Sequence, residues 1–291
     1  MLAKTVRDIR SLKIQGAEAI AVAAVRAVQH LCRNTRAEQF SDRLAAAHAA
    51  LISARPTEPF LRNCLNAIVH GNYLTVEEVQ RRIRLVLQHI ETADFHILRH
   101  ATPLMKNHAH IYTHCHSSTV THILKDAQQH GKKIVVHNTE TRPRFQGRIT
   151  AAELAKANIP VVHYVDAAMR IALQHAELML IGADAITTQG AVVNKIGSLL
   201  AAETAQSLGI PVYICTNSWK YDPATVHVDE PIEERAAKEV WDRAPKKVVI
   251  HNPAFDRIDP KLITAIISEL GIHTPEKFVR TVREKYPVLD S

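Results

Sequence analysis

Residues 109–139 read AHIYTHCHSSTVTHILKDAQQHGKKIVVHNT, and this stretch decides the fold. An apolar run at 109–114 breaks into the small polar residues 115–119. An amphipathic segment of helix length, 118–131, follows, and a second β-branched run begins at 133. This order predicts two parallel strands joined by a helix.

The same alternation continues to the end of the chain and predicts an α/β protein. Further short apolar runs lie at 160–166, 177–182, 211–216 and 247–252, with helical patterns at 150–158 and 195–209 between them. We therefore expect residues 106–291 to form a Rossmann-like, doubly wound parallel sheet domain. In such a sheet a ligand lies beyond the carboxyl ends of the strands, so this domain should carry most of the active site.

The first third of the chain has only helical periodicity. Apolar residues recur at three- and four-residue steps in 17–31, 37–54 and 75–100, while Pro56 and Pro59 must interrupt any helix. We expect residues 1–105 to form a helical N-terminal domain that packs on the sheet domain and closes one side of the cleft.

Composition excludes several classes of protein. Lys and Arg exceed Asp and Glu by 7, without a basic tract, so nucleic acid is an unlikely partner. The four cysteines include no CxxC pair, which argues against disulfides and structural zinc. The N-terminus lacks a secretory apolar core and no stretch approaches ~18 apolar residues, so we expect a cytoplasmic protein without a membrane span.

Cys115 is the first candidate catalytic residue, because it lies where the chain leaves a strand for a helix. A helix N-terminus favours a thiolate, and Ser117 with its neighbouring hydroxyls is typical of a phosphate-binding helix start. The alternative is an ordinary buried cysteine.

Asp184 is the second candidate, since it follows the apolar run 177–182, where a carboxylate is costly to bury without a partner. Asn194 and Lys195 supply an amide and an ammonium just before the next helix, a placement suited to phosphate or hydroxyl groups. A simple turn or N-cap aspartate is the alternative reading.

Two further loops follow predicted strands. In 140–147, ETRPRFQG, an arginine such as Arg142 can bind phosphate or pair with Asp184, and Gln146 ends the loop. Lys220 lies in 217–223, after another strand. Solvated surface side chains are the alternative for both loops.

The histidines at 108, 110, 114 and 116 raise the question of a metal site. No HExxH or CxxC companion is present, so we expect neither a metal nor another cofactor. A nicotinamide enzyme is also disfavoured, because no GxGxxG follows a predicted strand.

Five motifs, in order, resemble the superfamily that joins translation initiation factor 2B regulatory subunits with isomerases of phosphorylated aldoses. They are THCHS at 113–117, TETRPRFQG at 139–147, GADAITTQGAVVNKIG at 182–197, WKYDP at 219–223 and NPAFDRIDPKLI at 252–263. IQGA at 14–17 and RPT at 55–57 extend the similarity over nearly the whole chain.

The resemblance implies an enzyme of the ribose-1,5-bisphosphate isomerase branch, because initiation factor subunits typically lack the catalytic cysteine and commonly replace the aspartate. Cys115 and Asp184 would transfer protons during an aldose–ketose isomerisation of a phosphorylated pentose, and the chain would form at least a homodimer. The substrate contacts would be Gly16, Ala17, Arg55, Ser117, Gln146, Asn194, Lys195 and Lys220.

Two departures from the family pattern bear on the substrate. Gln15 and Ser118 stand where the family often has arginine and lysine, which weakens the case for a bisphosphate; the alternatives to ribose 1,5-bisphosphate are a sugar with one phosphate or with its phosphate placed differently. Methylthioribose-1-phosphate isomerase and a non-catalytic translation-factor-like sensor of sugar phosphates or nucleotides remain the alternatives.

Overall fold

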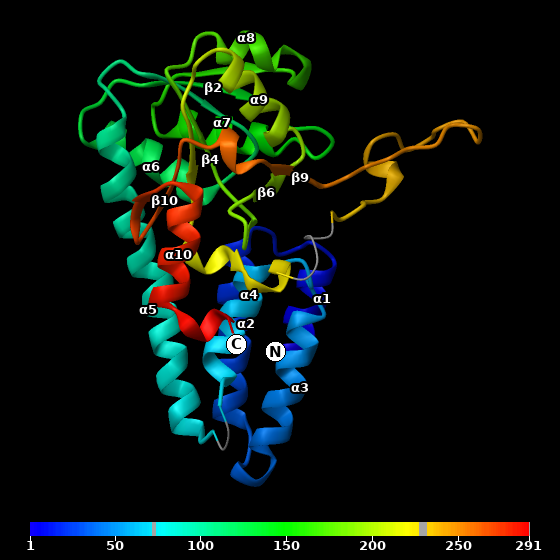
Figure 1. The fold of residues 1–291 in the computed structure, drawn as a ribbon. Helices are drawn as coiled ribbons and strands as arrows, with labels where there is room; N and C mark the ends of the chain where they lie inside the picture. Colours follow the sequence, from blue (N-terminus) through cyan, green and yellow to red (C-terminus); the bar gives the residue numbers. More distant parts are fainter. Residues whose placement is uncertain (72–73, 227–231, 291) are drawn as a thin grey trace.

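The first third of the chain is helical in the computed structural model, which describes residues 1–71, 74–226 and 232–290 (Figure 1). Each helix buries one apolar face, as Val79, Ile83 and Val86 do in the longest helix. The hydroxyl of Thr75 caps that helix by accepting a hydrogen bond from the Glu78 amide at 3.2 Å. The helices are α1 (Leu2–Arg10), α2 (Ala17–Asn34), α3 (Phe40–Ile52), α4 (Pro59–Val69) and α5 (Val76–Ala101).

The rest of the chain forms a seven-stranded sheet, which confirms the α/β fold expected from the sequence. Its order is β11-β10-β7-β4-β1-β2-β3, and every pair is parallel except β10 with β11. The strands are β1 (His110–Thr113), β2 (Val135–Thr139), β3 (Val161–Tyr164), β4 (Leu178–Ile181), β7 (Val212–Cys215), β10 (Ala265–Ser268) and β11 (Gly271–His273).

Helices cover both faces of this sheet, because alternate strand residues point to opposite sides. Ile111 of β1 packs in a cluster with residues of α5, α6 and α7, whereas Tyr112 packs in the cluster that contains α8 and α9. The sheet domain's helices are α6 (Ser118–Gln129), α7 (Gln146–Lys156), α8 (Met169–Leu173), α9 (Ser198–Ser207) and α10 (Pro275–Lys285).

The strand order reverses direction between β1 and β4. From β1 the chain proceeds to β2 and β3 on one side, whereas β4, β7 and β10 follow one another on the other side. The crossovers therefore diverge above these two strands and leave a crevice at their carboxyl ends. The chain segments that begin with Cys115 and Gly182 leave the sheet at this point.

A second, four-stranded sheet lies beside this crevice and was not expected from the sequence. Its order is β8-β5-β6-β9, and the β5–β6 and β6–β9 pairs are antiparallel. It comprises β5 (Ala185–Thr187), β6 (Val192–Lys195), β8 (Tyr221–Asp222) and β9 (Phe255–Ile258). Four of the sequence-predicted site residues lie on or next to its strands: Asp184, Asn194, Lys195 and Lys220.

The prediction of a strand at 247–252 is wrong. These residues belong to an arm that extends away from the body of the molecule (Figure 1, orange), and Val249 is 81% exposed. The position beside β7 is taken by β10, whose four residues are all buried. A β-branched run predicts a strand only when a sheet edge is available to pair with it, and here 265–268 occupies that edge.

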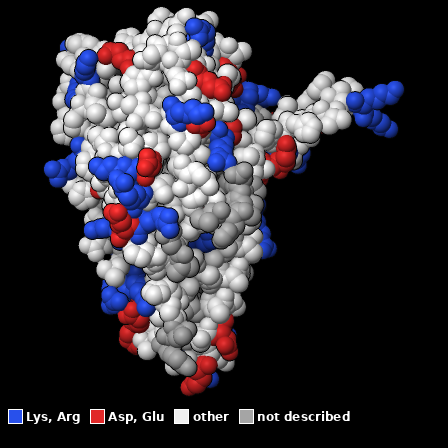
Figure 2. All heavy atoms as spheres, viewed as in Figure 1, with Lys and Arg blue, Asp and Glu red and all other residues white. Residues whose placement is uncertain are grey.

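The end of the chain returns to the helical part. Helix α10 contacts β10 and β11, and the turn at 287–290 contacts α4. On the face drawn in Figure 2, basic and acidic side chains are interspersed, and basic ones gather at the outer end of the arm. Within residues 1–71, 74–226 and 232–290, we find no helix with the length and hydropathy of a membrane span.

Candidate active site

A cavity of about 480 Å³ lies at the carboxyl ends of β1 and β4 and extends to the helices of the first third of the chain. Its wall brings together residues that are more than 200 positions apart in the sequence. Ten of the eleven sequence-predicted site residues line it: Gly16, Ala17, Arg55, Cys115, Ser117, Gln146, Asp184, Asn194, Lys195 and Lys220.

Cys115 is held in the wall through its backbone. Its φ of 65° is in the left-handed region, which costs a non-glycine residue ~1–3 kcal/mol and requires support from its surroundings. The Cys115 amide donates to the hydroxyl of Thr141 at 3.1 Å, and the Thr150 hydroxyl donates to the Cys115 carbonyl at 2.8 Å. Threonines after β2 and in α7 therefore fix the position of the thiol.

Burial makes Cys115 a weak acid. Loss of solvation is the largest cause that raises the pKa of its thiol to about 11, and the negative charge of Asp184 acts in the same direction. Lys195, the backbone amide of His116 and the guanidinium of Arg235 act in the opposite direction. In the free protein at neutral pH, the sulfur therefore carries its proton.

Asp184 follows β4 and directly precedes β5. Its amide donates to the carbonyl of Val193 at 2.9 Å, which fixes its backbone to the second sheet. Lys220 is tied to the same segment, because its ammonium donates to the carbonyl of Ala183 at 2.6 Å. A carboxylate and an ammonium thus lie together where the chain passes from one sheet to the other.

Asn194 and Lys195 reach the cavity from the end of β6. The Asn194 amide donates to the hydroxyl of Ser198 at 2.9 Å, and the Lys195 ammonium lies 4.7 Å from the ring centroid of Phe255. Burial lowers the pKa of Lys195, whereas Cys115 and Asp184 raise it. The lysine is therefore a poorly solvated cation, which binds an anion more strongly than an exposed lysine does.

The N-termini of α2 and α6 reach the cavity, and both are suited to anions. Gly16 is the N-cap of α2 with a φ of 84°, a conformation that favours glycine, and Ala17 begins the helix. Ser117 caps α6 by accepting a hydrogen bond from the Val120 amide at 3.4 Å. On α7, the buried Oε1 of Gln146 has no hydrogen-bond partner within the described protein and lines the same cavity.

Arg142 does not line this cavity. Its guanidinium donates to the carbonyl of Val240 at 3.0 Å and lies 5.0 Å from the ring centroid of Phe145. The loop 140–147 therefore orients this arginine toward the arm, and of its five polar side chains only Gln146 faces the cavity.

Sequence reasoning missed Arg235 and Glu58, and it considered His114 only as a possible metal ligand. Arg235 lies at the base of the arm, with a side chain 9% exposed, and Glu58 precedes α4 at 4% exposure; both line the cavity. The motif RPT at 55–57 was the only signal near Glu58, and no pattern marked Arg235.

His114 connects the two halves of the crevice. Its Nε2 lies 2.8 Å from the Ile196 carbonyl, which can only accept, so the proton is on Nε2 and the Thr139 hydroxyl donates to Nδ1 at 3.0 Å. Burial lowers the pKa of His114, in agreement with a neutral ring. In the described part of the chain, no three histidine, cysteine or acidic side chains are grouped so as to hold a metal ion.

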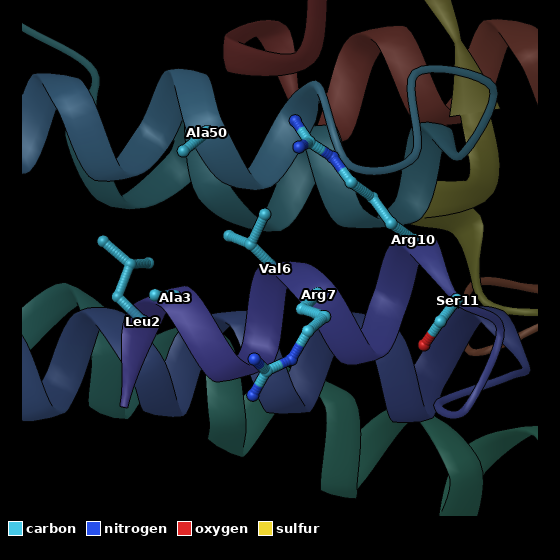
Figure 3. A pocket seen from close by; sticks show the side chains of 7 residues that line it. All are labelled: Leu2, Ala3, Val6, Arg7, Arg10, Ser11 and Ala50. Carbon is cyan, nitrogen blue, oxygen red and sulfur yellow. The ribbon is translucent and has the colours of Figure 1, made fainter.

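A second hollow, of about 630 Å³, lies on the surface beside α1 and α3 (Figure 3). It is lined by Leu2, Ala3, Val6, Arg7, Arg10, Ser11 and Ala50. None of these seven residues is an acid or a thiol, so this hollow does not offer the proton-transfer groups that the crevice does.

Comparison with known proteins assigns the family. The model of the initiation factor 2 subunit family matches residues 13–275. Ribose 1,5-bisphosphate isomerase of Archaeoglobus fulgidus is 33% identical over 95% of this chain and 91% of that protein. Methylthioribose-1-phosphate isomerase of Pelotomaculum thermopropionicum is 32% identical over 92% of this chain and 81% of that protein.

The fold agrees with this assignment. The crystal structure of the Pyrococcus horikoshii translation initiation factor eIF-2B matches 96% of this chain and 98% of that chain, with a TM-score of 0.87 and 27% identity. The superfamily expected from the five sequence motifs is thereby confirmed, and the chain belongs to the initiation factor 2 subunit family.

Proposed function

We propose that this protein is an aldose–ketose isomerase that converts a phosphorylated ribose into the corresponding ribulose, with ribose 1,5-bisphosphate as the first candidate substrate. The observation that carries the proposal is the placement of Cys115 and Asp184 in the wall of one cavity, where the strand order reverses. The similarity to sugar-phosphate isomerases over nearly the whole chain supports the same reaction class.

The proposed reaction needs two kinds of proton transfer. A proton is added to the ring oxygen as the sugar opens, and the C2 proton leaves to give an enol-type intermediate. The proton on the C2 hydroxyl then departs while C1 gains a proton, which leaves a ketone at C2. Asp184 is proposed to handle the protons on oxygen and Cys115 those on carbon.

The cations and amides of the wall are proposed to hold the phosphate. Lys195 and Lys220 supply charge, and the N-termini of α2 and α6 supply backbone N–H groups. Their fixed positions orient the sugar and stabilise the charge that develops on its oxygens.

The cavity wall bears on how many phosphates the substrate carries. The Gln15 side chain, which stands where the family often has arginine, donates to the Leu12 carbonyl at 2.7 Å. Glu18 and Asp94 line the cavity as well, and their charges oppose a second phosphate nearby. Ribose 1-phosphate and methylthioribose 1-phosphate therefore belong in the same assay as ribose 1,5-bisphosphate.

The test is proton NMR of these sugar phosphates incubated with the protein and with two variants. We expect ketose formation with at least one of them, abolished by Cys115→Ser. Asp184→Asn should lower turnover strongly while phosphate binding is kept. Wild-type rates in Cys115→Ser would refute the role of the thiol, and unchanged turnover in Asp184→Asn would remove that residue from the chemistry.

A non-catalytic sensor is the second candidate, because the fold matches a protein described as translation initiation factor eIF-2B. This reading requires that the protein bind sugar phosphates or nucleotides without converting any of them. Calorimetric binding together with unchanged NMR spectra for the whole panel would favour it over the isomerase.

We also propose that the chain forms a homodimer in which the arm contacts a second copy. The arm exposes Trp241 at 51% and Val249 at 81%, which is apolar surface that a partner would cover. Light scattering should give twice the chain mass of 32.5 kDa. Val249→Asp should shift the protein toward monomer, and a monomeric wild type would refute the proposal.

A further inference from the structure

Glu58 is an acid in the wall of the cavity for which the proposed reaction has no role so far. It is the N-cap residue of α4, but its side chain makes no capping hydrogen bond. It is 4% exposed, and it lines the cavity together with Asp184. Its position therefore directs it to the ligand site instead of the helix end.

One oxygen of this carboxyl is unsatisfied. Glu58 Oε1 is buried and has no hydrogen-bond partner within the described protein. A buried polar atom without a partner is unfavourable, because it has lost its hydrogen bonds to water without replacing them. A sugar hydroxyl in the cavity can remove this cost when substrate binds.

The charged groups around Glu58 come from four segments of the chain. Burial raises its pKa most, followed by the charge of Asp184; Lys220 and Arg55 lower the pKa, and Glu233 raises it slightly. Arg55 neutralises Glu233 as well as acting on Glu58, because its guanidinium forms an ion pair with Glu233 at 3.2 Å. The result is a pKa of about 8, so the carboxyl is mostly protonated at pH 7.

We propose that Glu58 is a substrate-binding residue that contacts a sugar hydroxyl as a neutral carboxylic acid. This inference rests on the proposed function. The protonated carboxyl can donate through its O–H and accept through its other oxygen, a pairing that suits a hydroxyl. The ionised carboxylate can only accept, and it adds a negative charge to a cavity that must receive a phosphate.

Glu58→Gln is the informative variant, because the amide is neutral at every pH, nearly the same size as the acid, and still both donor and acceptor. The measured quantity is the kcat/KM of the wild type divided by that of Glu58→Gln. We expect this ratio to be constant below pH 8 and about tenfold lower at pH 9. Glu58→Ala should raise KM at pH 7 by tenfold or more. Glu18→Gln is the control, because it changes another acid of the cavity and leaves Glu58 in place. Its kcat/KM should still fall near pH 8.

A constant ratio between wild type and Glu58→Gln up to pH 9.5 would overturn the inference, as would an unchanged KM in Glu58→Ala with a native circular dichroism spectrum. If Glu58→Ala is destabilised, the pH dependence of kcat/KM in Glu58→Gln is the deciding measurement.

Calorimetry separates this inference from the proposed function. The experiment compares Cys115→Ser with the double variant Cys115→Ser/Glu58→Gln at pH 9. Binding of ribulose 1,5-bisphosphate to the variant that keeps Glu58 should take up nearly one proton more than binding to the double variant. Equal proton uptake refutes the inference while the isomerase stands. The absence of both turnover and binding in the wild type refutes the proposed function, and this inference with it.

Discussion

Cys115 is expected to be a protonated thiol in the free protein, and alkylation can measure this. Burial raises its pKa from an ordinary value of 9.0 to about 11. A shift of about two units means that at pH 7.5 the thiolate fraction is about 100-fold smaller than for an unperturbed cysteine. Because iodoacetamide reacts with the thiolate only, the alkylation rate reports this fraction.

The assay follows alkylation of the peptide that contains Cys115 by mass spectrometry between pH 7 and pH 11. The rate should rise tenfold per pH unit up to about pH 10 and approach a plateau only near pH 11. Lys195→Met removes a cation that lowers the pKa of this thiol, so alkylation of the variant should be slower at every pH below the plateau. Cys115→Ser provides the background, and Cys64 and Cys215 are 0% exposed.

Two results would refute this reasoning. A plateau near neutral pH would mean that the thiolate forms in the free protein, so that the cations around the sulfur outweigh burial. Faster alkylation in Lys195→Met would mean that the lysine shields the sulfur sterically more than it stabilises its charge. A plateau near pH 11 would instead show that the thiol keeps its proton in the free protein at neutral pH.

Three further predictions concern stability and the shape of the cavity. Gly147→Ala places a Cβ 1.8 Å from the Thr139 carbonyl oxygen, so it should destabilise the protein by about 1–3 kcal/mol or more in urea unfolding; an unchanged midpoint would contradict this. Gly182→Ala places a Cβ 2.8 Å from the Ser117 hydroxyl oxygen and 2.9 Å from its Cβ, so this wall of the cavity must shift and both kcat/KM and the melting temperature should fall. Because the pKa of Glu58 is raised when folded, its contribution to stability is fully present below about pH 4.5 and lost as the pH rises through about 8. Glu58→Gln should therefore gain stability over the wild type between pH 5 and pH 8, on the order of 3 kcal/mol at pH 7, and parallel stability curves would contradict this.

Five strands of the main sheet, β1, β2, β3, β4 and β7, could be predicted from the sequence because they are short apolar or β-branched runs separated by helices, whereas β10 and β11 were not predicted. The apolar runs that contain β1 and β4 are visible without any knowledge of contacts, and their polar ends locate Cys115 and Asp184. The rule that ligands bind at the carboxyl ends of parallel strands then places both residues in one crevice.

The second sheet and the arm could not be predicted, because both depend on pairing between distant segments. Lys195 pairs with Phe255, sixty residues further on, and no local periodicity encodes this register. The run 247–252 has the composition of a strand, but composition does not say whether an edge is free to receive it.

The helical third of the chain completes the site, since residues at the ends of its helices line the open side of the crevice. Burial is the largest cause of the shifted pKa values of Cys115, Lys195 and Glu58, which come from three different parts of the fold. Glu58 and the N-terminus of α2 belong to the helices, whereas the thiol and the lysine belong to the two sheets. Water is therefore excluded from the thiol and the carboxyl only when both parts of the chain are assembled, and this exclusion favours their protonated forms. In a sheet domain without these helices, the pKa of Cys115 should be lower and the pKa of Lys195 higher.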